Sequence, residues 1–412
     1  MDTSGATALP LELDKFRLLA VPFAACLAIV CGLIGVSPAS TSPPSKDSFS
    51  RLSARANAAR DAERLDEAVT LYRKALALRP SWAEGWWSLG TIQYDRNVYD
   101  EATRAFLKVT ALTPKNGTAF AMLGLCEFEL GKDELALKHI RKGADIGLQK
   151  DPSLWQVVLY HQGILQQRKG NFQAAQETLE DLCLRGGQGD DLANVLGMTL
   201  LRMDSKNPPT PGSVDANIVV RVGRAECLAG KKKYDEARPA FDAVVKENPS
   251  YPNIHYAYGL FLMELRDVAA GVEQFKQEIE NNPNHVLARL RIAACLYKED
   301  SAAGIPPAEE AVKLDPSLPF GHYLLGLLLL DTDKSDRAIP ELEIAQKTYG
   351  HDPKLYAALG SAYSRVGRKQ DAARARATFE SLTKQAENSN ALGNDARGGT
   401  AGIPIDGVPP PH

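Results

Sequence analysis

The sequence has no basic run and no marked excess of either charge. Its 48 basic and 51 acidic residues are spread over 412 positions and give a formal net charge of −3. Proteins that bind nucleic acid neutralise phosphates with lysine and arginine gathered on one face or in one run. This composition argues against nucleic acid as a partner, and we predict none.

Motifs of metal, phosphate and acid–base chemistry are also missing. Neither CxxC nor HExxH occurs, and the seven histidines are scattered without a second ligand at metal spacing. The turns 131–133 and 230–232 lack the glycine-rich lead and the Ser/Thr of a phosphate-binding loop. The acidic pair Asp100-Glu101 stands at an expected helix start, where negative charge favours the helix dipole. We therefore predict no catalytic residue, no cofactor and no metal, and a protein that is not an enzyme.

Cysteine is scarce, and its spacing predicts no disulfide in the body of the chain. Cys126, Cys183, Cys227 and Cys295 lie at least 44 residues apart, mostly in segments that are not expected to be neighbours. Free cysteine packs like a small apolar residue. We expect these four side chains to be core residues that do not meet.

One long apolar run is present, at residues 18–36, after a polar segment at residues 1–17. The run carries no charge, and a helix of this length reaches about 28 Å, close to the thickness of a bilayer core. Residues 37–39 are small enough for a signal peptidase. Because the run is longer than the core of a usual signal peptide, and Glu12 and Asp14 dilute the positive start, we favour an uncleaved transmembrane helix over a cleaved signal sequence.

The side of the membrane on which the chain lies is left open by its charges. Lys15 and Arg17 before the run are balanced by three cations at residues 46–55. A lipid-modified Cys26 is a further alternative, disfavoured because the apolar run continues past it. We expect a membrane-anchored or exported protein of a bacterial-type cell envelope.

A fixed period of 34 residues runs through the chain. Ala68, Ala102 and Ala136 share it, and Gly90 and Gly124 each precede the next of these alanines by 12 residues. Such a period indicates stacked repeats. Because glycine weakens a helix, its recurrence predicts two helices in close contact. The matching alanines of the chain are Ala68, Ala102, Ala136, Ala175, Ala237, Ala338 and Ala372.

The repeated motif resembles the tetratricopeptide repeat family. The second unit carries that family's pattern at Trp86, Leu89, Gly90, Ala102, Phe106 and Pro114. Similar units start near Phe49, Ala83, Gly117, Gln156, Ile218, Pro252, Val286, Pro319 and Pro353. The resemblance implies an all-α, right-handed superhelical solenoid of about nine to ten helix-turn-helix repeats.

Breaks in the pattern predict the division of the array. We expect a linker at residues 37–48, an N-terminal lobe at 49–203 and a C-terminal lobe at 218–385. A proline-rich loop at 204–217 replaces the second helix of one repeat and separates the lobes. The last residues, 386–412, are rich in Ala, Gly, Asn and Ser, which predicts a disordered tail.

The resemblance also implies a binding groove lined by the first helix of each repeat. Its second, fifth, ninth and twelfth positions hold large apolar side chains at Trp87, Tyr94, Phe128, Tyr160, Tyr256, Met263, Tyr297 and Tyr323. Aromatic residues dominate interface hot spots, so these are candidate contacts for a protein or peptide partner. We expect the first three to form one patch.

The functional prediction is a membrane-associated, non-enzymatic scaffold or adaptor that holds peptide segments in the groove. A structural subunit of an envelope assembly or export complex is the alternative. A third reading, the substrate-recruiting arm of an enzyme, requires a catalytic domain that the repeats leave no room to encode.

Overall fold

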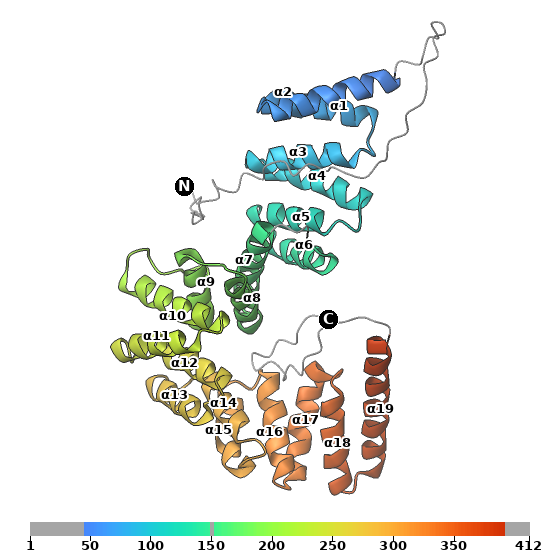
Figure 1. Ribbon diagram of the computed structural model, residues 1–412. Coiled ribbons are helices and arrows are strands. Elements are labelled where there is room, and N and C mark those ends of the chain that lie inside the picture. The colour runs from blue at the N-terminus through green and yellow to red at the C-terminus, as the bar shows by residue number, and fades with distance from the viewer. Residues whose placement is uncertain (1–44, 149–151, 392–412) are drawn as a thin grey trace, which may run out of the picture. The chain divides into compact units, whose positions relative to one another are not determined.

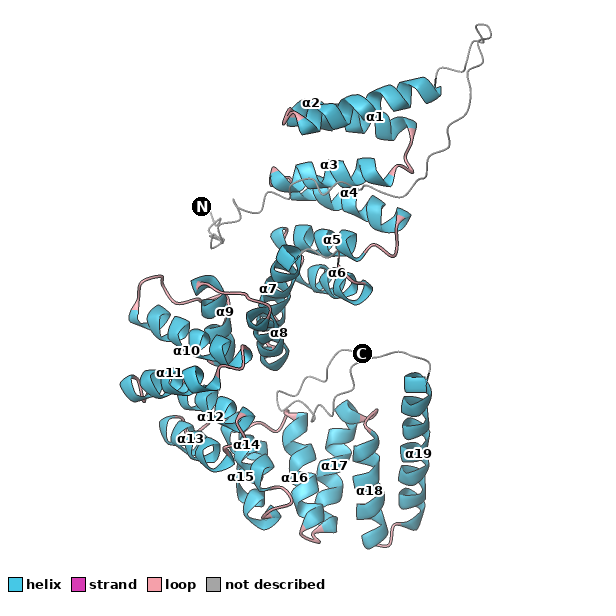
Figure 2. Cartoon of the chain, viewed as in Figure 1, coloured by secondary structure: helices cyan, strands magenta, loops and turns pink. Residues whose placement is uncertain are grey.

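The computed structural model describes residues 45–148 and 152–391. Within these ranges every regular element is an α-helix, and no strand is present (Figure 2). The helices are α1 (Ser45–Asp61), α2 (Leu65–Leu78), α3 (Ala83–Asp95), α4 (Tyr99–Leu112), α5 (Gly117–Glu129), α6 (Asp133–Ile146), α7 (Pro152–Arg168), α8 (Phe172–Leu184), α9 (Asp190–Leu200), α10 (Val214–Gly230), α11 (Tyr234–Glu247), α12 (Ile254–Glu264), α13 (Val268–Asn281), α14 (Val286–Leu296), α15 (Ser301–Leu314), α16 (Pro319–Asp331), α17 (Ser335–Tyr349), α18 (Pro353–Arg365) and α19 (Lys369–Ala391).

The helices follow one another as helix-turn-helix pairs, with α9 standing between two pairs (Figure 1). This confirms the predicted all-α array of tandem repeats. The predicted membrane segment at residues 18–36 lies outside the described residues. None of the helices in the described part of the chain is both long and apolar enough to cross a bilayer. The last helix continues to Ala391, six residues into the segment for which a disordered tail was expected.

The turn inside each pair is built in the same way along the array. Glu63, Asn97 and Gly131 stand 34 residues apart, and each has a left-handed backbone, with φ of 56°, 59° and 68°. That conformation reverses the chain between two helices within a few residues. The sequence period is therefore a period of backbone geometry as well.

Close contact between paired helices explains the recurring small residues. A Cβ placed on Gly124 of α5 would lie 2.7 Å from Ile140 Cγ1 and 2.9 Å from the carbonyl oxygen of Ala136 on α6. No side chain fits at that distance without moving a helix. The seven alanines at the matching position of the second helices are all buried. The predicted packing is confirmed at these sites.

The chain forms two compact units, divided between Leu165 and Gln166 within α7. In the first unit, the core contains Tyr72 and Leu89 near the start of the array and Phe106 and Ile140 further along it. The division falls upstream of the loop at 204–217, where the sequence pattern placed it.

The second unit begins with an arrangement that departs from the repeat. Helix α9 is followed by an irregular segment, and α10 then packs against both α9 and α8. The approach is very close, since a Cβ on Gly223 would lie 1.7 Å from the carbonyl oxygen of Ala193, and one on Gly197 would lie 1.9 Å from that of Val219. The expected loop therefore lies inside the second unit, and its last residues already belong to α10.

Candidate functional site

The predicted groove residues of the first unit are half-buried. Trp87 packs edge-on against the Phe106 ring, with centroids 5.5 Å apart, and Tyr94 meets Tyr99 at 5.6 Å. Phe128 and Tyr160 both contact His161, at 4.6 Å and 5.6 Å. Trp87, Tyr94 and Phe128 pack against the core of the first unit, and all four rings keep some exposed surface. Removing Trp87 or Phe128 would therefore reduce core packing as well as any contact with a partner.

Two of the predicted groove residues in the second unit are core residues. Tyr256 is 0% exposed and Tyr323 is 4% exposed, so neither offers a peptide the aromatic surface that we expected. Tyr256 is enclosed because His285 and Phe275 lie against its ring, at 5.0 Å and 5.7 Å. Tyr323 packs on Tyr349 at 5.6 Å.

The other two, Met263 and Tyr297, are half-buried. Met263 Sδ lies 3.8 Å from Cys295 Sγ, and Lys298 Nζ lies 5.0 Å from the centre of the Tyr297 ring.

An open pocket of about 240 Å³ lies in the second unit between α8, the end of α9, and the first helices α12 and α14. Its walls combine amide, hydroxyl, carboxyl and guanidinium groups with a few apolar side chains. The lining residues are Phe172, Gln173, Gln176, Glu177, Glu180, Thr199, Leu200, Arg202, Leu260, Glu264 and Arg291. None of these was among the predicted groove residues.

Arg202 is held in the pocket wall by two aromatic rings. Its guanidinium carbon lies 5.1 Å from the centre of the Phe172 ring and 5.2 Å from that of Tyr256, which is close enough for a cation–π interaction. The residue has a left-handed backbone, with φ of 52°, directly after α9. Arg266 and Lys298 stand at the same place, two residues after α12 and α14, so a left-handed cation recurs at this turn of the array.

Arg291 is the second cation that lines the pocket. Its Nε is buried and has no hydrogen-bond partner, and no carboxylate in the described part of the chain forms an ion pair with it. A buried polar group without a partner costs free energy, which a ligand carboxylate or carbonyl would offset. Arg291 follows Val286, the start of its unit, by five residues, so the four groove positions taken from the repeat family did not include it.

Two carboxyl groups lie together at the back of this region. Gln176 Nε2 donates hydrogen bonds to Glu226 Oε1 at 2.6 Å and to Glu180 Oε1 at 2.8 Å. Burial, and then the neighbouring Glu180 charge, raise the pKa of Glu226 well above its usual value of 4.5. Burial also raises the pKa of Glu180. The pair therefore binds protons more readily in the folded state than in the unfolded chain.

This pair makes stability depend on pH. Because the folded pKa of Glu226 is raised, its contribution is fully present below the unfolded pKa and is lost as the pH rises through the folded pKa. Each unit of the shift is worth about 1.4 kcal/mol. We expect the melting temperature of the second unit to be lower at a pH well above 4.5 than at pH 4.5, the usual value of a glutamate pKa. Glu226→Gln mimics the protonated form. Its melting temperature should be higher than that of the native chain at the higher pH, and it should change less between the two pH values.

Glu177, which is exposed and lines the pocket, supplies the control, because Glu177→Gln removes a carboxylate that is not buried. Equal pH dependence of the Glu226→Gln variant and the native chain, measured by thermal unfolding, would contradict the buried carboxyl pair as its source.

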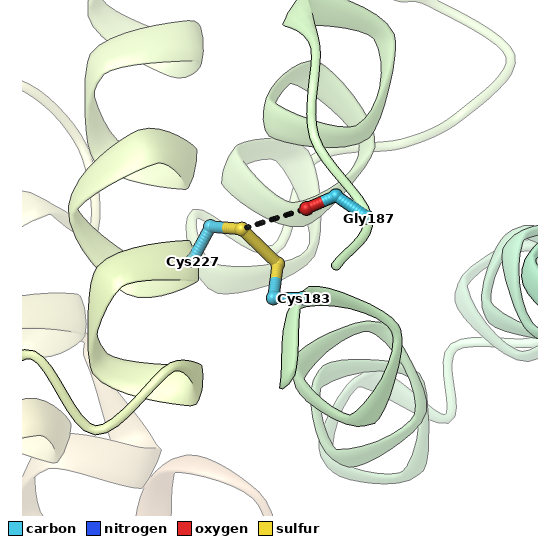
Figure 3. Close-up of a disulfide and its surroundings, with 3 residues drawn as sticks. All are labelled: Cys183, Gly187 and Cys227. Carbon is cyan, nitrogen blue, oxygen red and sulfur yellow. Dashed lines mark hydrogen bonds between the residues drawn. A yellow bond between two sulfur atoms is a disulfide. The ribbon is translucent and has the colours of Figure 1, made fainter. Parts of the chain in front are cut away.

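The expectation for the cysteines is wrong for one pair. Cys183 of α8 and Cys227 of α10 form a disulfide, with their Cα atoms 5.5 Å apart (Figure 3). They meet because α10 packs against α8 as well as α9, so helices that are not consecutive become neighbours. The Cys227 sulfur also lies 4.0 Å from the carbonyl oxygen of Gly187. Cys126 is buried and free, as expected, and Cys295 is half-buried and free.

Comparison with a family model identifies the repeats. Residues 53–116 and 222–285 match the tetratricopeptide repeat, the first segment in the first unit and the second in the second unit. The chain therefore contains tetratricopeptide repeats on both sides of the division. The matched residues in the second unit include Glu226, Cys227 and the whole of α12.

Known proteins with similar sequence or structure match only part of this chain. Protein O-mannosyl-transferase TMTC3 of Homo sapiens is 28% identical over 247 residues, which are 57% of this chain and 26% of that protein. This chain thus spans about a quarter of that relative's length. Among solved structures, the MamA RS-1 ArsTM double mutant is 21% identical, with a TM-score of 0.39, and covers 41% of this chain and 96% of its own. A crystal structure of MamA protein is 18% identical, with a TM-score of 0.39. The match covers 44% of this chain and 98% of the MamA chain.

Proposed function

We propose that this protein is a non-enzymatic scaffold that holds a peptide segment of a partner protein against the pocket between α8, α12 and α14. The tandem repeats supply the general argument, because stacked helix pairs present extended binding surfaces. The unpaired guanidinium of Arg291 supplies the specific one. A cation whose buried Nε has no partner is ready to bind a carbonyl or carboxylate group of a ligand.

The chemistry of the pocket indicates what kind of segment it would hold. Leu260 and Phe172 give apolar surface, while Arg291 offers donors beside it. A peptide has both kinds of group at regular spacing, since its backbone is polar and its side chains are mixed. An extended segment with an acidic side chain placed at Arg291 is the ligand that this combination favours.

Arg291→Met tests this proposal. Because Arg291 has no ion pair to lose, and its buried Nε is without a partner, we expect the melting temperature to be unchanged or slightly higher. Partner binding should weaken by about tenfold to about 150-fold, which corresponds to about 1.5 to 3 kcal/mol for a charge-assisted hydrogen bond. The measurement is quantitative co-purification of the partner with the full-length protein from its native membranes.

Lys276→Met is the matched control. Lys276 is an exposed cation of the second helix α13 and does not line the pocket, so its loss should leave binding unchanged. If Arg291→Met also left binding unchanged while the protein remained folded, the partner would bind elsewhere. The half-buried rings of Trp87 and Phe128 in the first unit would then be the next candidate.

The proposed site of action is a membrane surface. Support comes from the uncharged run at residues 18–36, which has the length of a bilayer-spanning helix. Envelope assembly or export is a setting in which an anchored scaffold would hold one partner beside another. A structural subunit of such a complex would differ from a transient adaptor by co-purifying at a fixed ratio.

A second candidate function is the substrate-recruiting arm of an enzyme. It is favoured by one observation, the similarity of 57% of this chain to part of a protein O-mannosyl-transferase. An assay of mannose transfer to protein by the purified full-length chain distinguishes the two. Activity there would replace the scaffold proposal.

A further inference from the structure

The disulfide between α8 and α10 results from the most unusual packing of the chain. Cys183 lies in the last turn of α8, and Cys227 lies one turn from the end of α10. Their Cα separation of 5.5 Å is within the range that a disulfide bridges without backbone movement. The contact between α8 and α10 is also close at Gly230, where an added Cβ would lie 3.1 Å from the Cα atom of Glu180 on α8, so the two helices approach each other at a point that involves no sulfur.

Both sulfur-bearing residues are shielded once the bond has formed. Cys183 is 0% exposed and Cys227 is 8% exposed, and the segment at Gly187 lies against Cys227 (Figure 3). A reductant in solution attacks a disulfide through a thiolate that must reach one of the sulfurs. The bond is therefore protected in the folded protein, as a structural disulfide is.

The two free cysteines among the described residues do not compete with Cys183 and Cys227 for disulfide formation. Cys126 lies in the first unit and is buried, and burial raises the pKa of its thiol to about 12. Burial also raises the pKa of Cys295, whose nearest sulfur is that of Met263. A thiol that stays protonated exchanges slowly with a disulfide. The pair at 183 and 227 can form without rearranging into other pairings.

We infer that the repeat array lies on the oxidising side of the membrane, beyond the cytoplasm. Buried structural disulfides form and persist in exported compartments and are rare where thiols are kept reduced. Oxidation forms one S–S bond and removes two protons and two electrons from the two thiols. A disulfide-donating thiol oxidant of that compartment accepts them and becomes a dithiol.

This inference decides an orientation that the charges around residues 18–36 leave open. It places the segment before the apolar run on the cytoplasmic side and the array on the far side. It does not rest on the proposed peptide-binding function, because a scaffold could bind the same peptide on either side.

A thiol count on the full-length protein in its own cells tests the inference. Cells are quenched in acid, the protein is dissolved in detergent, and maleimide labelling is counted by intact mass before and after reduction. We expect two more reactive thiols after reduction than before, from Cys183 and Cys227.

In parallel, protease is added to cells whose outer envelope has been opened and whose cytoplasmic membrane is intact. We expect the array to be digested.

Two single variants identify the pair. Cys183→Ser should abolish the difference in thiol count, whereas Cys126→Ser, which changes a free cysteine, should preserve it. Equal counts before and after reduction in the native chain would overturn the inference. A difference of two in an array that resists protease behind an intact membrane would overturn it as well, because the bond would then exist in the cytoplasm.

Discussion

Gly223→Ala is expected to unfold the start of the second unit. The added methyl group would lie 1.7 Å from the carbonyl oxygen of Ala193, and the two backbones would have to separate. Overpacking usually costs about 1 to 3 kcal/mol, and here the obstacle is backbone, so we expect a loss above about 3 kcal/mol. Urea unfolding of the variant, followed by circular dichroism, measures the loss.

Gly360→Ala is the matched control for this prediction. A Cβ there would lie 3.5 Å from Arg376 Cγ and 3.8 Å from the carbonyl oxygen of Ala372, which is ordinary contact. Alanine is a better helix former than glycine by up to about 1 kcal/mol, so this variant should be as stable as the native protein or more stable. Equal stability of the two variants would show that α9 and α10 are further apart than described.

Removing the disulfide is the second change with a large expected effect. The Cys183→Ala/Cys227→Ala double variant frees a segment of 44 residues in the unfolded chain. The chain-entropy relation for a closed loop of this length gives a loss of about 4 kcal/mol at 25 °C. The free energy of unfolding of the second unit, measured in urea, should fall by this order.

The native chain with and without a strong reductant provides the control for the double variant. Reduction should bring the native unfolding curve close to that of the variant, and the variant itself should not respond. A native chain that unfolds identically in both conditions would show that the two sulfurs are not bonded.

The architecture could be predicted from the sequence alone because each repeat places its own local requirements on the residues. Each turn needs a left-handed residue, and Glu63, Asn97 and Gly131 supply it at the same spacing. Each helix pair needs small residues at its contact, and Gly124 facing Ala136 shows why. These requirements recur every 34 residues, so they can be recognised in the sequence without knowledge of how the repeats are arranged in space.

The site could not be predicted in the same way, because it depends on the departure from the repeat. Helix α10 packs on α8 only because no second helix follows α9, and this joins Cys183 to Cys227 and brings Glu226 beside Glu180. The burial of Tyr256 likewise depends on Arg202 and His285, which come from segments outside its own helix. A positional rule for groove residues contains no information about such contacts.

Photo-crosslinking from the pocket tests the scaffold proposal most directly. A photoreactive amino acid replaces Leu260, which lines the pocket on α12, in the full-length protein in its own cells. We expect a covalent adduct with one partner protein from position 260, loss of that adduct when Arg291→Met is added, and none from position 276 on α13. Adducts of equal yield from both positions, or an adduct at 260 that is unaffected by Arg291→Met, would contradict it.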